Sequence, residues 1–280
     1  LVLAATVALV ALFLSNVNLA EVWREVRAAN PWLLVAAIAL QALTYLLRAR
    51  RWQTLLEPVG RVRLVPALRA TVIGFAANAL LPARAGEFLR PYLLARREGL
   101  RATAVFATII LERFLDLALV VLLFGVFVVW ADERTLSADP RLFNAVETAG
   151  ITAAIVAALA LVAFTVLAGH PERLARLTER LTTTLPDRLG RALTHAVRAF
   201  AEGLAVMRRP ALVLRAFGLS IPLWLSIALT IWLVARAFHI TIPFTGTFLI
   251  VALLTVGVAV PTPGAVGGFH YALRLGVDDD

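Results

Sequence analysis

Cysteine and lysine are absent from this 280-residue sequence, and charged residues of either sign are scarce. Without cysteine, a disulfide framework, a cysteine-ligated zinc site and thiol catalysis are all excluded. Only 16% of the residues are charged and 61% are hydrophobic, whereas an average soluble domain is about 25% charged. The mean hydropathy is +0.86. This composition excludes a soluble globule or a disordered tail, and it predicts an all-α, polytopic transmembrane bundle.

Several signatures of enzymes are absent as well. The four histidines show no metal-ligand spacing, and the sequence has neither a P-loop nor a dinucleotide fingerprint. The longest hydrophilic stretch has about 40 residues, whereas typical domains have about 50–250. We therefore expect no metal and no cofactor, and we expect a transporter more than an enzyme.

All of the formal positive charge comes from arginine. The chain has 27 arginines against 18 acidic residues, a net charge of +9. In a soluble protein the pI near 11.4 would suggest nucleic acid. In so apolar a chain it indicates cytoplasmic loops and contact with anionic lipid headgroups. The predicted partners are therefore membrane lipids and not nucleic acid.

Five apolar segments approach the length of about 20 residues that a transmembrane helix needs. The predicted spans cover about residues 1–16, 32–47, 102–130, 148–168 and 211–238. A signal sequence is the alternative for the first segment, but no small-x-small cleavage site follows it. Because the sequence starts inside an apolar run without an initiator Met, we treat it as a piece of a longer protein. A final span is expected after residue 280.

Two further apolar segments are short and broken by proline or glycine. Residues 65–81 have arginine-rich sequence on both sides, and residues 247–260 run directly into a Pro-Thr-Pro-Gly sequence. We predict two re-entrant elements, at about 65–90 and 247–268. The two halves of the chain then resemble an inverted repeat, an arrangement typical of transporters.

Loop charges predict the orientation in the membrane. Residues 48–101 have a net charge of +8 and residues 170–209 of +4, whereas residues 17–31 are neutral and residues 131–147 have −2. By the positive-inside rule, the first two segments face the cytoplasm. Residues 170–209 are also amphipathic, which fits either an interfacial helix pair on anionic lipid or a cytoplasmic hairpin packed on its own bundle.

Three motifs contain the candidate functional residues. In the first, Arg84 and Arg90 can hold a phosphate through bidentate contacts, and Glu87 can pair with either arginine or meet a cationic headgroup. The alternative is a solvated cytoplasmic turn. The second motif places Glu112 and Asp116 on one face of a helix. Its three charges indicate either a polar cavity for a headgroup or a structural ion-pair network.

The third motif is a run of proline and glycine that cannot stay helical. It can present backbone N–H groups to an anion, or it is an ordinary extracellular turn. The predicted substrate-contact residues are Asn78, Arg84, Glu87, Arg90, Glu112, Arg113 and Asp116. The predicted hinge positions of the re-entrant elements are Pro82, Gly86, Pro261, Pro263, Gly264, Gly267 and Gly268.

These three motifs, in this order, resemble the signatures of the lysylphosphatidylglycerol synthase transmembrane-region family, also called the flippase-like domain family. The resemblance covers nearly the whole chain and implies packed membrane helices with re-entrant elements. In bifunctional members the domain is fused to an aminoacyltransferase and moves the aminoacylated lipid between leaflets. We expect no transferase domain within these 280 residues, and His270 stands where members often have an acidic residue.

We therefore predict a lipid flippase or transporter of the prokaryotic inner membrane that moves a phospho- or glycolipid. One alternative is a membrane-embedded transferase acting on a lipid phosphate, with Glu87 or Asp116 as general base. The other is a non-catalytic subunit that recruits an envelope-lipid biosynthesis enzyme through residues 170–209. A homo-oligomer of this chain is a further alternative for its partners.

Overall fold

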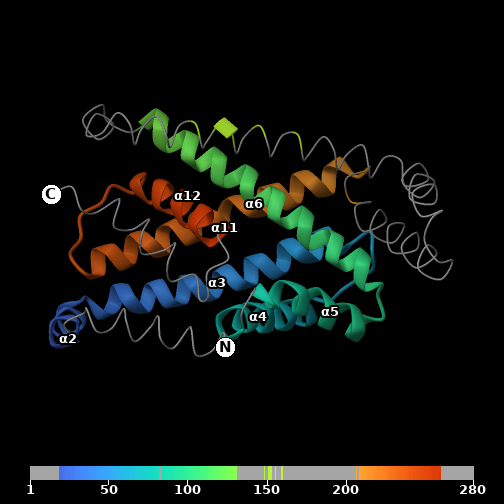
Figure 1. Cartoon of the computed structure of the whole chain (residues 1–280), viewed down its shortest axis with the longest axis horizontal. Helices are drawn as coiled ribbons and strands as arrows, with labels where there is room; N and C mark the ends of the chain where they lie inside the picture. The colour runs from blue at the N-terminus through green and yellow to red at the C-terminus, as the bar shows by residue number, and fades with distance from the viewer. Residues whose placement is uncertain are drawn as a thin grey trace, which may run out of the picture.

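The computed structural model describes residues 19–81, 84–130 and 208–259, together with the single residues 148, 151, 152, 155, 159 and 206. This part of the chain contains seven helices and no strand, so the predicted all-α class is confirmed for it (Figure 1). The predicted span 1–16 and almost all of residues 170–209 lie outside the described residues. In the predicted span 148–168, the five described residues are helical.

Three helices are long and apolar enough to cross a membrane: α3 (Pro31–Leu56), α6 (Ala102–Trp130) and α11 (Pro210–Ala237). They have 26, 29 and 28 residues, against about 20 needed to span the hydrocarbon core. The predictions of apolar helices at 32–47, 102–130 and 211–238 are therefore confirmed. Helix α3 continues to Leu56, beyond the predicted end of the second span at residue 47, and where the span ends in a bilayer stays a prediction.

The helical extension of α3 is explained by burial. Arg48, Arg51 and Trp52 all lie on buried faces of its last turns, so they belong to the core and not to a loop. At its other end, α3 starts as the sequence predicts, with Pro31 in the first turn. Asn30 is the N-cap, and its side chain accepts from the backbone N–H of Trp32 at 3.0 Å.

Helix α3 packs along α11, and the two run antiparallel (Figure 1). Asn30 donates its backbone N–H to Ala237 O at 2.9 Å, and the hydroxyls of Thr44 and Ser226 hydrogen-bond at 2.9 Å near the middle. The short helix α2 (Leu19–Ala28) precedes α3 at the same end. The beginning of α3 therefore meets the end of α11.

Helix α12 (Gly246–Ala259) follows α11 and packs against α6. The contact is apolar and aromatic, because Phe248 is buried in one cluster with Phe124 and Phe127 of α6. Beyond residue 259 the predicted re-entrant element lies outside the described residues.

Helices α4 (Leu64–Leu80) and α5 (Gly86–Glu98) form a helical hairpin beside α3 and α6. At 1.5 Å per residue they are about 26 and 20 Å long, shorter than the hydrocarbon core of about 30 Å. The hairpin begins where α3 ends and finishes where α6 begins, and Gly60 contacts Leu100 between its two ends (Figure 1). A re-entrant element has to start and finish on the same side of the membrane, and the α4–α5 hairpin starts and finishes at the same end of the bundle. The position of the hairpin in a bilayer stays a prediction.

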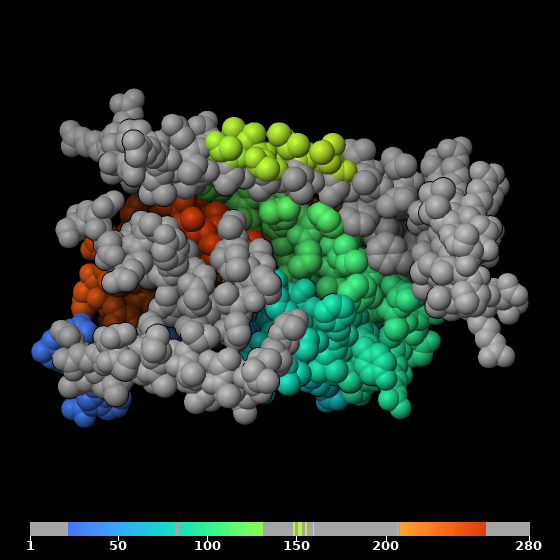
Figure 2. Space-filling model, viewed as in Figure 1, coloured from blue at the N-terminus to red at the C-terminus, as the bar shows by residue number. Residues whose placement is uncertain are grey.

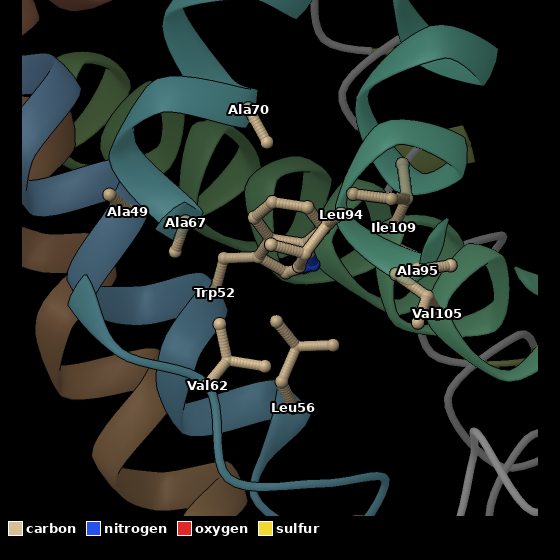
Figure 3. Close-up of a cluster of buried hydrophobic side chains, with 10 residues drawn as sticks. All are labelled: Ala49, Trp52, Leu56, Val62, Ala67, Ala70, Leu94, Ala95, Val105 and Ile109. Carbon is tan, nitrogen blue, oxygen red and sulfur yellow. The ribbon is translucent and has the colours of Figure 1, made fainter. Parts of the chain in front are cut away.

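A hydrophobic cluster attaches the base of this hairpin to the bundle (Figure 3). The Trp52 ring of α3 is fully buried and lies beside Leu94 of α5, with Ala67 of α4 and Val105 of α6 nearby. Because a buried tryptophan contributes a large apolar area, this cluster orients the face of α5 that carries Arg90.

Candidate functional site

A buried network of ion pairs lies where α3, α6 and α11 meet. Arg51 of α3 is 0% exposed and bridges both acidic side chains of α6. Its Nη1 donates to Asp116 Oδ1 at 2.6 Å and its Nη2 donates to Glu112 Oε1 at 3.0 Å. Nη1 also donates to Ser220 Oγ of α11 at 2.8 Å. One guanidinium reaches both carboxylates because residues four apart share a helical face.

The hairpin contributes a second buried arginine to the same network. Arg90 of α5 is 4% exposed, and its Nη1 lies 3.2 Å from both oxygens of Glu112. Its Cζ lies 4.0 Å from the centroid of the Trp52 ring, a close cation–π contact. Trp52 is itself held by a 2.9 Å hydrogen bond from Nε1 to Thr108 Oγ1. Arg90 is therefore positioned between a carboxylate and an aromatic face.

Two further arginines approach Asp116 from other directions. Arg113 Nη2 lies 3.4 Å from Glu112 Oε1 and 3.4 Å from Asp116 Oδ2. Arg48 Nη1 is more distant, at 3.9 Å from Asp116 Oδ2. Trp224 of α11 donates its Nε1–H to Asp116 Oδ1 at 3.0 Å. Asp116 therefore contacts side chains from three helices.

The charges of this network do not balance among the described residues. We call it the arginine cluster, and its members are Arg48, Arg51, Arg90, Arg113, Glu112 and Asp116. Four cations face two anions, which leaves two surplus positive charges. Buried charges are costly unless they are paired. Four buried guanidinium nitrogens have no hydrogen-bond partner within the described part of the chain: Arg51 Nε, Arg90 Nε, Arg90 Nη2 and Arg113 Nε.

The side chains at the tip of the hairpin form a separate pair. Arg84 Nη2 contacts Glu87 Oε1 at 2.6 Å, and the two side chains are 41% and 26% exposed. Glu87 is also close enough to Arg113 to attract it electrostatically. Arg84 has a φ of 53°, in the left-handed region that non-glycine residues rarely adopt. Asn78 Oδ1 is buried and has no hydrogen-bond partner among the described residues.

Two glycines allow α5 to lie directly against α4. A Cβ atom on Gly86 would collide with the carbonyl oxygen of Gly74 and lie 2.6 Å from Asn78 Oδ1. A Cβ atom on Gly74 would lie 2.7 Å from Arg90 Cβ. The sequence predicts Gly86 as a hinge, and in the structure it is the first residue of α5 at a close helix contact. Its role as a hinge stays a prediction, whereas its packing role follows from these contacts.

The structure brings together four of the seven predicted substrate-contact residues: Arg90, Glu112, Arg113 and Asp116. Arg84 and Glu87 pair nearby at the hairpin tip, next to Asn78. The proposed substrate role of all seven stays a prediction. Of the predicted hinge positions, six lie outside the described residues: Pro82, Pro261, Pro263, Gly264, Gly267 and Gly268.

Sequence reasoning missed the residues that complete the arginine cluster. These are Arg48 and Arg51 of α3, with Ser220 and Trp224 of α11. Residues 48–52 read Arg-Ala-Arg-Arg-Trp, directly after an apolar run. We assigned the arginines of this stretch to a cytoplasmic loop, although arginines three apart at the end of an apolar helix also fit a buried face.

Comparisons with known proteins agree with the resemblance seen in the motifs. The family model described as "Lysylphosphatidylglycerol synthase TM region" matches residues 1–277. A relative named "Glycosyltransferase AglD", from Haloferax volcanii, is 30% identical over 125 residues, which are 44% of this chain and 20% of the relative. The chain therefore spans about a fifth of the length of that relative. No solved structure shows a significant match. The chain belongs to the lysylphosphatidylglycerol synthase TM-region family.

Proposed function

We propose that this member of the family moves a lipid with a phosphate-bearing headgroup between the two leaflets of a prokaryotic inner membrane. In this proposal the arginine cluster contacts the phosphate. The observation that carries it is the surplus of two positive charges in the arginine cluster, together with buried guanidinium N–H groups that have no partner among the described residues. A phosphate or phosphodiester supplies both the missing negative charge and the missing acceptors, and the planar guanidinium matches it through paired hydrogen bonds.

The depth of the cluster supports contact with a headgroup in transit. Glu112 and Asp116 lie 10 and 14 residues after Ala102, the start of α6. These separations correspond to about 15–21 Å along the helix, about halfway through a hydrocarbon core of about 30 Å. A charged network at that depth has no structural need for surplus cations, because two arginines would neutralise two carboxylates.

The proposed orientation places the end of the bundle with the hairpin base in the cytoplasm. This end carries exposed arginines, among them Arg61, Arg63 and Arg209. The opposite end carries exposed tryptophans, with Trp32 79% and Trp130 75% exposed. Arginine on the cytoplasmic side and tryptophan at an interface are both expected for membrane helices. The α4–α5 hairpin then enters from the cytoplasm as a re-entrant element and presents Arg90 to the cluster.

Arg113 is the member of the cluster that a headgroup meets first in this proposal. Its side chain is 37% exposed, whereas the side chains of Arg48, Arg51 and Arg90 are 11%, 0% and 5% exposed. Its contacts to the two carboxylates, both 3.4 Å, are also longer than those of Arg51. Arg113 can therefore turn towards a phosphate while Arg51 keeps Glu112 and Asp116 in place.

The test uses the full-length protein in proteoliposomes with headgroup-labelled lipids and an impermeant reductant that bleaches the outer leaflet. Wild type should accelerate bleaching of the protected half of the label. Arg113→Gln should slow this step by about tenfold or more, because a hydrogen bond to a charged group is worth about 1.5–3 kcal/mol. The matched control is Arg215→Gln, which removes an exposed arginine that pairs with Glu57 at 3.5 Å.

Two results would overturn the transport proposal. One is the absence of acceleration by wild type with every phospholipid, glycolipid and polyprenyl phosphate supplied. The other is an equal effect of Arg113→Gln and Arg215→Gln, because the exposed pair has no role in the proposed path. Monodisperse elution of both variants shows that the comparison is made between folded proteins.

A second candidate function is participation in sugar transfer to a lipid phosphate. The similarity to a relative named a glycosyltransferase favours it. The geometry gives it less support, because Asp116 contacts arginines through both oxygens and Glu87 pairs with Arg84. A general base needs a carboxylate that is free to take a proton. Turnover of a labelled sugar donor in detergent, where leaflets do not exist, would favour this second function.

A further inference from the structure

Helices α4 and α5 line an open pocket of about 330 Å³ that is separate from the arginine cluster. We call it the hairpin groove. Its floor is apolar and includes Ile73 of α4 and Leu93 of α5. Three exposed arginines line it: Arg69 of α4, with Arg96 and Arg97 of α5. Figure 2 shows α4 and α5 at the molecular surface, on the lower right of the described part.

The groove has a surplus of positive charge. Among the described residues, one carboxylate lies within ion-pair range of its three arginines, with Glu98 Oε1 at 3.9 Å from Arg97 Nε. Arg96 makes a long contact within the described part of the chain, 3.5 Å from Nη1 to the Tyr92 hydroxyl. Three guanidinium groups around one small pocket are suited to an anion with several acceptor oxygens, such as a phosphate.

The polarity of the groove changes along the hairpin. Arg69 lies in the second turn of α4 and Arg97 in the last turn of α5, both near the base of the hairpin. Ile73 and Leu93 lie four residues further towards the tip, which is about one helical turn. The charged part is therefore at the base and the apolar part is nearer the tip. A phospholipid has the same sequence of polarity from its headgroup to its chains.

The geometry points to the hairpin groove as a docking site for an anionic phospholipid of the cytoplasmic leaflet. The arginines contact the phosphate, and one acyl chain lies along the apolar floor towards the tip. This inference uses the membrane orientation of the proposed function but not its transport step. A basic groove at the headgroup level also has the charge expected for recognition of anionic lipid. Occupation of the groove would place lipid on the hairpin that carries Arg90.

The test measures equilibrium binding of chain-labelled phosphatidylglycerol to the full-length protein in detergent. The groove variant is Arg69→Gln/Arg96→Gln/Arg97→Gln. The control variant, Arg61→Gln/Arg63→Gln/Arg209→Gln, removes the same charge from exposed positions at the same end of the bundle. The groove variant should bind the lipid at least about tenfold more weakly than wild type. The control variant should stay within about twofold of wild type.

A second variant examines the apolar floor and separates a lipid from a free ion. Ile73→Trp fills the groove and should weaken phosphatidylglycerol binding, while inorganic phosphate in excess should displace little of the lipid. If phosphate displaces the lipid fully and Ile73→Trp has no effect, the groove is an ion site and the lipid proposal fails. Because Ile73 and Arg69 are both exposed, Ile73→Trp and the single change Arg69→Gln keep the test valid if the triple variant does not fold.

Equal weakening by the groove and control variants would show a general basic surface and overturn the proposal. Unchanged binding in the groove variant would overturn it as well. Because Arg113 does not line the groove, the groove changes should weaken lipid binding by the same factor whether position 113 is Arg or Gln. Loss of lipid binding in the groove variant, with slow bleaching in Arg113→Gln, would support both proposals. Weaker lipid binding in the groove variant without slower bleaching in Arg113→Gln would mean that the transport proposal fails and the docking site stands. Slower bleaching in Arg113→Gln without weaker lipid binding in the groove variant would mean the reverse.

Discussion

Arg51 and Arg90 are both buried arginines that contact Glu112, but the structure predicts very different losses of stability when they are replaced. Arg51 makes three hydrogen bonds and is the side chain that links both carboxylates of α6 to α3. Arg90 shares Glu112 with Arg51 and Arg113, and its Nε and Nη2 have no partner among the described residues. We expect Arg51→Met to reduce stability strongly and Arg90→Met to reduce it little.

The magnitudes follow from the cost of buried charge. Removing one member of a buried ion pair costs about 3–5 kcal/mol, and we expect Arg51→Met to fall in this range. That is a loss of about two to four orders of magnitude in the folding equilibrium. Arg90→Met leaves Glu112 paired with Arg51 and Arg113, so no carboxylate is left buried without a cation, and the variant should stay within about 1 kcal/mol of wild type. Methionine also keeps a favourable contact with the Trp52 ring.

Unfolding in mixed micelles with increasing SDS measures the free energy of unfolding of each variant. Arg215→Met is the control, because an exposed ion pair contributes only about 0–1 kcal/mol. In the bleaching assay the order should reverse among folded proteins, so that Arg90→Met slows transport although its stability is close to wild type. Equal destabilisation by Arg51→Met and Arg90→Met would refute the reasoning that Arg90 is a surplus charge.

Two further predictions concern the packing of helices. Gly86→Ala should destabilise the protein by about 1–3 kcal/mol, because the new methyl group collides with the Gly74 carbonyl. Gly125→Ala should be neutral or stabilise by up to about 1 kcal/mol, since its Cβ meets nothing within 4 Å. Equal melting temperatures of the Gly86→Ala and Gly125→Ala variants would contradict this prediction. The hydroxyl contact of Thr44 with Ser226 should show a coupling energy of about 0.6 kcal/mol in a double-mutant cycle with Thr44→Val and Ser226→Ala. A coupling above about 2 kcal/mol, measured by SDS unfolding, would contradict the second prediction, because both hydroxyls also have backbone acceptors.

The long apolar helices and the second motif could be predicted from the sequence because both depend on local pattern. Hydropathy over about 20 residues is sufficient to identify a membrane helix, and this identified α6 and α11 closely. The spacing of Glu112 and Asp116 was sufficient to place them on one face. The continuation of α3 as a buried helix past residue 47 was not predicted, because arginine lowers local hydropathy whether it is solvated or buried against a carboxylate.

The sequence by itself determined the class of the protein. An apolar, cysteine-free chain with arginine-rich segments can satisfy its backbone in a membrane only as helices or a closed barrel, and its long apolar runs require helices. The three motifs indicated the family, which the family match confirms. These properties depend on composition and on residues close together in the chain.

Only the tertiary structure decided which charges meet. Arg51 reaches Glu112 and Asp116 across 61 and 65 residues, and Ser220 across 169. No local pattern contains such partners, because they are set by the packing of α3 on α6 and on α11. The surplus of positive charge in the arginine cluster therefore becomes visible only when the helices are packed together, since each helix alone shows charges without their partners.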